Sequence, residues 1–197
     1  EARPHQQAAI DAVCSKLDGR GQLIMACGTG KTLTGQRITE ALKSETTLVL
    51  LPSLLLLSGT MNEWLQHTKV GFHYLPVCSD ASIGGKAAPE TNFTSGELGN
   101  ASTTDPDEIR AFLKQKGNKV IFSTYQSSGR VAEAIQGTKT CFDLILADEA
   151  HRCAGKVAAD YGYVLDEKKL PARNRLSRTA TPRIYKSNVK KAAKDAD

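Results

Sequence analysis

The chain has 197 residues, of which 40% are hydrophobic, so it is long enough and apolar enough for one domain with a packed core. It has no apolar run of the roughly 18 residues that span a membrane, and "EARPHQQAAI" is not a secretory signal, which would have a basic stretch followed by an apolar one. No CxxC pair occurs among its five cysteines. We therefore expect a cytoplasmic protein with free thiols. The net charge is +5, but ten basic and no acidic residues lie within 168–194, a segment that suits either a polyanion such as nucleic acid or a solvated surface.

The first half of the chain predicts alternating helices and strands. Apolar residues have helical spacing over 4–17, and a polar, glycine-containing turn at 18–21 ends that helix. The short apolar run "QLIMA" at 22–26 predicts a buried strand. The next elements are a helix over 31–43, a strand over 46–52 that Pro52 ends, a helix over 58–68 and a strand over 72–78.

The second half continues the alternation after a polar loop or insertion at 79–105. A helix begins near Pro106, with acidic residues in its first turn, and runs to about residue 116. A strand over 119–125, a helix over 127–136, a strand over 142–148 and a last strand over 175–180 follow. This alternation predicts an α/β fold, in which a mostly parallel sheet has helices on both faces of a single domain over 1–197.

The stretch "MACGTGKT" at 25–32 predicts a phosphate-binding loop between a strand and a helix. Gly28 and Gly30 let the backbone wrap closely around an anion at the helix N-terminus. Lys31 reaches the β- and γ-phosphates, and the Thr32 hydroxyl binds the Mg²⁺ that bridges them. The general pattern requires Gly where this chain has Met25, so the match is incomplete and an ordinary strand-to-helix turn is the alternative. The expected cofactor-binding residues of the loop are Cys27, Gly28, Thr29, Gly30, Lys31 and Thr32.

A pair of carboxylates follows the apolar strand in "LILADEAH" at 144–151. Asp148 and Glu149 fall at the carboxyl end of a parallel strand, the edge at which open α/β sheets bind ligands. In that place Asp148 would hold Mg²⁺, and Glu149 would orient or deprotonate the water that attacks the γ-phosphate. The alternative is a pair of acids that cap the next helix. His151 either couples the nucleotide site to the rest of the protein or is a structural hydrogen-bonding residue.

With these motifs the chain resembles the first RecA-like, ATP-binding domain of superfamily-two DEAH-type helicases, a P-loop NTPase fold. "RPHQQ" at 3–7 is similar to the adenine-recognition motif, which implies that Gln6, with Arg3 beside it, contacts ATP. The family's phosphate loop does not require the early glycine, and "DEAH" at 148–151 matches its Mg²⁺ and water-activating motif. The wording of the motifs is most similar to bacterial and phage restriction-type helicases, the motor subunits of restriction enzymes. The resemblance implies ATP and Mg²⁺ as cofactors and nucleic acid as a partner, and it favours DNA over RNA without distinguishing them.

Further motifs of the family imply how ATP and nucleic acid are coupled. "TATP" at 179–182 looks like the coupling motif, through Thr179 and Thr181. The segments at 50–57 and 122–127 lie where the family contacts the nucleic-acid backbone, which implies contacts from Ser53, Thr124 and Gln126. Strand-end hydroxyls and a surface amide are the alternative explanation of those three.

Two departures from the family pattern bear on activity. The strand before "TATP" is usually apolar, whereas this chain has Arg175, Ser177 and Arg178. Because a buried, unpaired Arg is costly, either this strand lies at an exposed edge of the sheet or its coupling role is weakened. The family's second RecA-like domain, with its arginine fingers, is not in the sequence. We therefore expect weak binding of ATP–Mg²⁺ and little or no hydrolysis by this chain alone, with the basic segment 168–197 leading toward the second domain.

Three functions follow from these motifs. The leading one is the ATP-binding half of a nucleic-acid-dependent motor, a helicase or DNA translocase that grips phosphates without reading sequence. The second is a non-motor module that binds nucleic acid or a partner through a degenerate helicase domain, which the polar strand favours and Glu149 disfavours. A small-molecule kinase is the third, and it needs neither the adenine motif nor "TATP".

Overall fold

The computed structural model describes residues 2–79, 102–148 and 166–180, and within them six strands form one parallel sheet. The strand order is β1-β6-β5-β2-β4-β3, and the carboxyl ends of the strands share one edge of the sheet. The strands are β1 (Arg20–Ile24), β2 (Thr46–Leu51), β3 (His73–Val77), β4 (Lys119–Thr124), β5 (Phe142–Asp148) and β6 (Ala172–Thr179). The predicted α/β fold with a mostly parallel sheet is confirmed.

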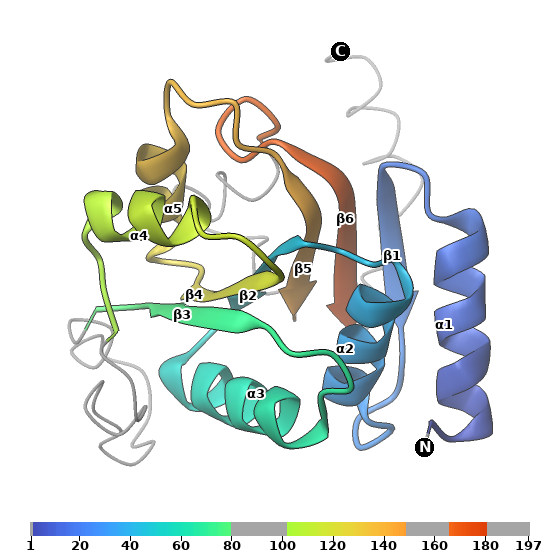
Figure 1. Cartoon of the computed structure of the whole chain (residues 1–197). Coiled ribbons are helices and arrows are strands. Elements are labelled where there is room, and N and C mark those ends of the chain that lie inside the picture. Colours follow the sequence, from blue (N-terminus) through green and yellow to red (C-terminus); the bar gives the residue numbers. More distant parts are fainter. Residues whose placement is uncertain (1, 80–101, 149–165, 181–197) are drawn as a thin grey trace, which may run out of the picture.

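Helices lie on both faces of the sheet, as Figure 1 shows. One face carries α1 (Pro4–Lys16), α2 (Lys31–Ala41) and α3 (Leu54–His67), and the other carries α4 (Pro106–Leu113) and α5 (Ser128–Ile135). In the described connections the carboxyl ends of β1, β2 and β4 each lead into a loop that precedes a helix, as crossovers between parallel strands require. The phosphate-loop segment is such a connection, between β1 and α2.

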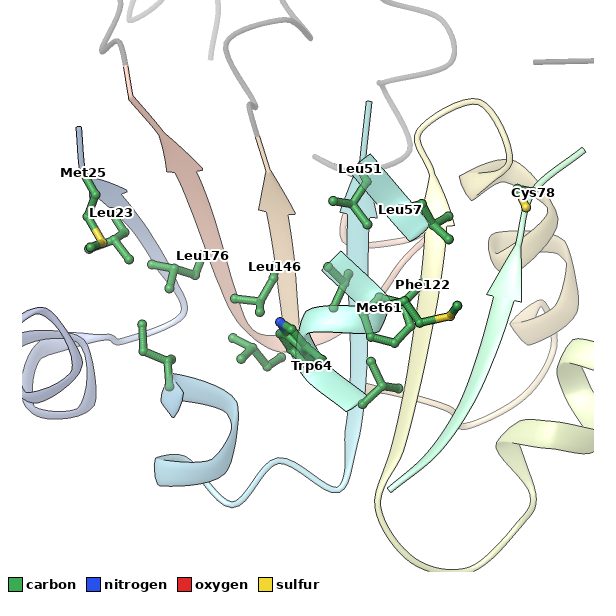
Figure 2. Packing of buried hydrophobic residues seen from close by; sticks show 14 of the residues in the cluster. Leu23, Met25, Leu51, Leu57, Met61, Trp64, Cys78, Phe122, Leu146 and Leu176 are labelled. Carbon is green, nitrogen blue, oxygen red and sulfur yellow. The ribbon is translucent and has the colours of Figure 1, made fainter. Parts of the chain in front are cut away.

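The alternation of side chains along the buried strands builds two core clusters. On β5, Leu144 and Leu146 point to the cluster under α1–α3, whereas Ile145 and Ala147 point to the cluster under α4 and α5. Figure 2 shows the first cluster, with the indole of Trp64 lying over the strands. Side chains on both faces are thus buried, which explains why these strands read as continuous apolar runs.

Most predicted elements are present, with shifted ends, but the strand predicted to be buried at 22–26 is β1, which lies at an edge of the sheet and has Ile24 52% exposed. Helix α3 begins at Leu54 rather than at 58, because the Ser53 side chain accepts a hydrogen bond from the Leu56 N–H at 3.4 Å and caps the helix. Leu54 is 6% exposed and Leu57 is fully buried, so the extra turn packs on the core. Helix α4 ends three residues earlier than predicted, and β6 begins at Ala172 rather than at 175.

Strand β6 is interior, so the first of the two explanations for its polar residues, an exposed edge of the sheet, is wrong. It pairs with β1 on one side and with β5 on the other. Arg175 is 8% exposed and Arg178 is completely buried. Those two charges of the basic 168–194 segment therefore face the core and contribute neither to a solvated surface nor to a polyanion site, while residues 181–194 lie outside the described part.

The expected loop at 79–105, the cysteines and the expected absence of a membrane span are described only in part. Residues 80–101 of the expected loop lie outside the described residues, and Thr103 forms a parallel bridge with Val77 at the end of β3. The four described cysteines, Cys14, Cys27, Cys78 and Cys141, are free thiols. In the described ranges no helix is both long enough and apolar enough to cross a membrane.

Candidate nucleotide-binding site

The phosphate loop leaves the carboxyl end of β1 and turns into α2. Gly28 and Gly30 have φ angles of 74° and 79°, in the left-handed region that favours glycine. Gly30 is the N-cap of α2, and the helix begins at Lys31 with no acidic side chain in its first turn. The positive end of the helix dipole is therefore not neutralised by the helix itself, which suits an anion such as a phosphate.

The Lys31 side chain lies across this loop. Its Nζ is 3.4 Å from the carbonyl oxygens of both Met25 and Ala26. These long contacts are weak hydrogen bonds, which a phosphate oxygen would readily replace. Cys27 is exposed, and the Thr29 hydroxyl donates to the Ala26 carbonyl at 2.7 Å, so the loop turns tightly on itself.

Gln6 at the start of α1 is hydrogen-bonded to the phosphate loop. Its Nε2 donates to the carbonyl of Thr29 at 3.0 Å, and its Oε1 accepts from the Arg3 backbone N–H at 2.8 Å. Gln6 is 4% exposed, whereas the Arg3 residue is exposed. A Cβ at Gly30 would lie 2.3 Å from Gln6 Nε2, so the absence of a side chain at Gly30 allows this contact.

Asp148 is the last residue of β5, at the same edge of the sheet. Its residue is 8% exposed, and in the sheet register it lies beside Arg178 of β6. The Arg178 Nη2 is 3.6 Å from Asp148 Oδ2. The Tyr125 hydroxyl donates to the Asp148 backbone carbonyl at 2.7 Å, so the end of β5 is also held by the residue that follows β4.

Arg178 connects the carboxylate to the phosphate loop. Its Nη1 donates to the backbone carbonyl of Lys31 at 3.0 Å, while Nη2 faces Asp148. The Thr32 carbonyl accepts from the Trp64 indole N–H at 3.1 Å, so α3 also holds the first turn of α2. The two segments predicted to hold ATP–Mg²⁺ are therefore linked through one guanidinium.

Asp148 and Thr32 would hold Mg²⁺, and their chemistry fits that ion. Mg²⁺ takes oxygen ligands and is commonly held by one or two carboxylates together with substrate phosphates. In the described ranges no group of three or more His, Cys, Asp or Glu side chains is arranged for a metal. A hydroxyl and one carboxylate beside a phosphate loop suit a metal that arrives with a nucleotide rather than a permanent metal centre.

The remaining predicted site residues differ in burial and in their hydrogen bonds. Thr179 ends β6 beside the loop, where its carbonyl accepts from the Met25 N–H at 3.1 Å. Gln126 is exposed after β4, but Thr124 is 2% exposed and its hydroxyl donates to Ser127 Oγ at 3.1 Å. Ser53 caps α3. Thr124 and Ser53 thus each make a local hydrogen bond of the kind that the alternative explanation expects. The residues Glu149, His151 and Thr181 lie outside the described residues.

Sequence reasoning missed three contributors to this site. Tyr125 and Trp64 act through backbone carbonyls of their partners, which leave no pattern in the sequence. Gly35 gives room to the Arg178 guanidinium, because a Cβ there would lie 2.1 Å from Nη1. The only signal was Arg178 itself, which departs from an apolar strand.

A cavity of about 270 Å³ lies away from this site. It is lined by residues that precede β2, β3 and β4, including Glu45, Phe72 and Asn118, and by Trp64. It therefore opens near the amino ends of the strands. The phosphate loop and Asp148 are at the carboxyl ends, where the helix dipole and the carboxylate favour a nucleotide, so this cavity is not the candidate site.

Comparison with known families decides the relationship that this geometry suggests. The family model described as "Type III restriction enzyme, res subunit" matches residues 1–184. The chain belongs to this restriction-enzyme res-subunit family. It is a first RecA-like domain of the restriction-type, superfamily-two helicases, and the resemblance stated above is confirmed.

Individual relatives of this res-subunit domain are much longer proteins. A "probable helicase" of African swine fever virus (isolate Tick/South Africa/Pretoriuskop Pr4/1996) is 30% identical over 186 residues, which are 93% of this chain and 20% of that protein. The Type ISP restriction-modification enzyme LlaGI, solved with a DNA substrate mimic, is 33% identical with a TM-score of 0.73 over 94% of this chain and 18% of its own. LlaBIII, an ATP-dependent Type ISP enzyme bound to DNA, is 31% identical with a TM-score of 0.77 over 94% of this chain and 13% of its own. The chain thus spans a fifth or less of each.

Proposed function

We propose that this chain is the ATP-binding half of a cytoplasmic DNA-dependent motor, which couples ATP hydrolysis to movement along DNA or to strand separation. One observation carries the proposal: Arg178 bridges the first residue of α2, at 3.0 Å, and the Asp148 carboxylate, at 3.6 Å. The predicted phosphate loop and the carboxylate proposed to hold Mg²⁺ therefore lie at one edge of the sheet. Membership in the res-subunit family supports the proposal, since the LlaBIII relative is described as ATP-dependent and bound to DNA.

Each residue has a defined task in this proposal. Lys31 exchanges its weak carbonyl contacts for the β- and γ-phosphates, and Gln6 contacts the adenine from the start of α1. Thr32 and Asp148 hold Mg²⁺, which neutralises developing phosphate charge when it is bound with ATP. Glu149 positions the attacking water, and the second RecA-like domain completes the site. We expect binding but little hydrolysis by this chain alone.

Coupling to DNA would run through the ends of β2, β4 and β6. His151, Thr179 and Thr181 would transmit the state of the nucleotide, and Gln126 is placed for a backbone contact because it is exposed after β4. Ser53 would reach phosphate from the N-terminus of α3, whose dipole favours an anion. The buried Thr124 hydroxyl is left out of this set, because it already donates to Ser127.

Calorimetric titration with Mg²⁺–ATP tests the nucleotide site. We expect heat of binding with ATP and none with GTP, and the Lys31→Ala variant should lose the ATP signal. Lys116→Ala is a matched control, because Lys116 is exposed and its substitution removes one positive charge outside the phosphate loop. A well-folded chain that binds no nucleotide, or a Lys31→Ala variant that binds as tightly as the parent, would refute the assignment.

A non-motor binding module is the second candidate, and the buried polar residues of β6 favour it. The two candidates differ in the longer protein that contains both RecA-like domains. A motor hydrolyses ATP there, and DNA accelerates the reaction. A binding module retains DNA without DNA-stimulated hydrolysis, so measured phosphate release with and without DNA separates them.

A further inference from the structure

A completely buried cation lies next to the proposed metal ligand. Arg178 is 0% exposed, and Nη1 donates to the Lys31 carbonyl at 3.0 Å. Among the residues that the structure describes, Nε and Nη2 have no hydrogen-bond partner. The charge is balanced there by Asp148, whose Oδ2 is 3.6 Å from Nη2. A buried charge needs such a partner, because the interior solvates it poorly.

The fold fixes the guanidinium in this position from two sides. Asp148 and Arg178 are neighbours in the register of β5 and β6, two residues beyond the buried pair of Leu146 and Leu176. All four side chains therefore point to the same face, the one that α2 covers. At Gly35 of α2 an added Cβ would lie 2.1 Å from Arg178 Nη1 and 3.5 Å from Leu146 Cδ1, so the guanidinium is held between α2 and β5.

We propose that Arg178 is a positioning residue that acts as the counter-ion of Asp148 in the metal-free site and competes with the metal for that carboxylate. The inference rests on the proposed function, because it takes Asp148 to be the magnesium ligand. A cation 3.6 Å from the carboxylate lowers the attraction of Asp148 for a second cation. Metal binding therefore weakens the ion pair between Arg178 of β6 and Asp148 of β5. Since β6 ends at Thr179, one residue after Arg178, the occupancy of the metal site is communicated to the coupling motif.

A double-mutant cycle tests the counter-ion role without nucleotide. The unfolding equilibrium is measured in EDTA for the parent chain, Arg178→Met, Asp148→Asn and the double variant. We expect Arg178→Met to raise the unfolding constant strongly in the parent and at least about tenfold less in the Asp148→Asn background, since close buried charge pairs couple by about 1.5 kcal/mol or more. Equal effects in both backgrounds would overturn the proposal.

Arg175→Met is the matched control for this cycle. Arg175 is also a buried Arg of β6, but it faces the opposite side of the sheet, where it donates to the Leu170 carbonyl. Burial lowers the pKa of its guanidinium, so its removal also relieves a desolvation cost. We expect Arg175→Met to have the same effect with Asp148 and with Asn at position 148.

Metal affinity is the second readout. The apparent dissociation constant of Mn²⁺ is measured by its paramagnetic signal in the chain saturated with ATP. We expect Arg178→Met to bind Mn²⁺ about tenfold more tightly than the parent, and Arg175→Met to be unchanged. Gly35→Ala, which keeps Arg178 but displaces its guanidinium, should shift the affinity in the same direction and serves if Arg178→Met does not fold. Unchanged or weaker binding in these variants would overturn the proposal.

The two readouts keep this proposal separate from the proposed function. If the parent chain binds no nucleotide, the proposed function fails and the metal half of this inference fails with it, while the cycle in EDTA still decides whether Arg178 and Asp148 are coupled. If ATP and Mn²⁺ bind but Arg178→Met changes nothing, the proposed function stands and the role of Arg178 is refuted.

Discussion

Substitution of Gly35 by Ala should destabilise the protein, although the same change in the interior of a helix ordinarily stabilises it. Ala is favoured over Gly in a helix by about 1 kcal/mol. At Gly35 the added Cβ would lie 2.1 Å from Arg178 Nη1 and 3.0 Å from Cζ, so the buried guanidinium has to move away. That movement breaks the 3.0 Å hydrogen bond to the Lys31 carbonyl, and a hydrogen bond from a charged donor contributes about 1.5–3 kcal/mol. The expected net change is a loss of about 0.5–2 kcal/mol in the free energy of unfolding.

Urea denaturation followed by the fluorescence of Trp64 measures this difference, because the chain has one tryptophan and it is buried. Gly59→Ala is the matched control. Gly59 is exposed and lies in the middle of α3, where an added Cβ meets nothing within 4 Å. We expect Gly59→Ala to stabilise the protein by up to about 1 kcal/mol. If Gly35→Ala is as stabilising as Gly59→Ala, the close packing of the guanidinium against α2 is wrong.

Three further changes test contacts around the site. Tyr125→Phe removes the hydrogen bond to the last carbonyl of β5 and should lower the free energy of unfolding by about 1 kcal/mol, measured by urea denaturation; no loss would show that the bond contributes nothing. Gly30→Ala should cost more than the roughly 1–2 kcal/mol of a left-handed backbone, because its Cβ also meets Gln6 Nε2, and the excess should vanish in a Gln6→Ala background. The hydrogen bond and charge of Arg20 lower the pKa of Glu167, so this pair stabilises the fold at pH values above the ordinary carboxylate pKa. The parent should therefore have a higher free energy of unfolding than Glu167→Gln at neutral pH, and the difference should disappear as the pH falls below about 4. A difference that persists in acid would contradict the ion pair.

The elements were predictable from the sequence where local pattern decides them. Continuous apolar runs bounded by glycine and polar residues gave β2, β4 and β5 almost to the residue. The start of α3 was missed by four residues, because Ser53 caps a run of leucines that has no polar face to mark its helical period. Strand order was beyond reach, since it depends on which apolar faces pack together. For this reason an exposed edge was one of the two explanations of the polar β6, although the strand lies between β1 and β5.

The same division holds for the candidate site. Lys31 and Asp148 belong to motifs that come at the end of a predicted strand, and the structure brings the two segments to one edge of the sheet. Trp64 and Tyr125, in contrast, donate to backbone carbonyls of Thr32 and Asp148. Every residue has such a carbonyl, so no sequence pattern identifies the pair, and only the packing of α3 and of the turn after β4 shows it.

Arg178 is where the sequence and the structure have to be considered together. The sequence showed a charge in a strand that should be apolar, and the cost of burying an unpaired Arg was the correct physical concern. The structure answers that concern with a carbonyl of α2 and the carboxylate of Asp148, both supplied by segments distant in sequence. A buried ion pair of this kind rarely makes a protein more stable than an apolar pair of the same volume. Stability alone therefore gives little reason for an Arg at this position, whereas a charge that balances Asp148 until a metal arrives gives one, and the metal-affinity measurement distinguishes these two explanations.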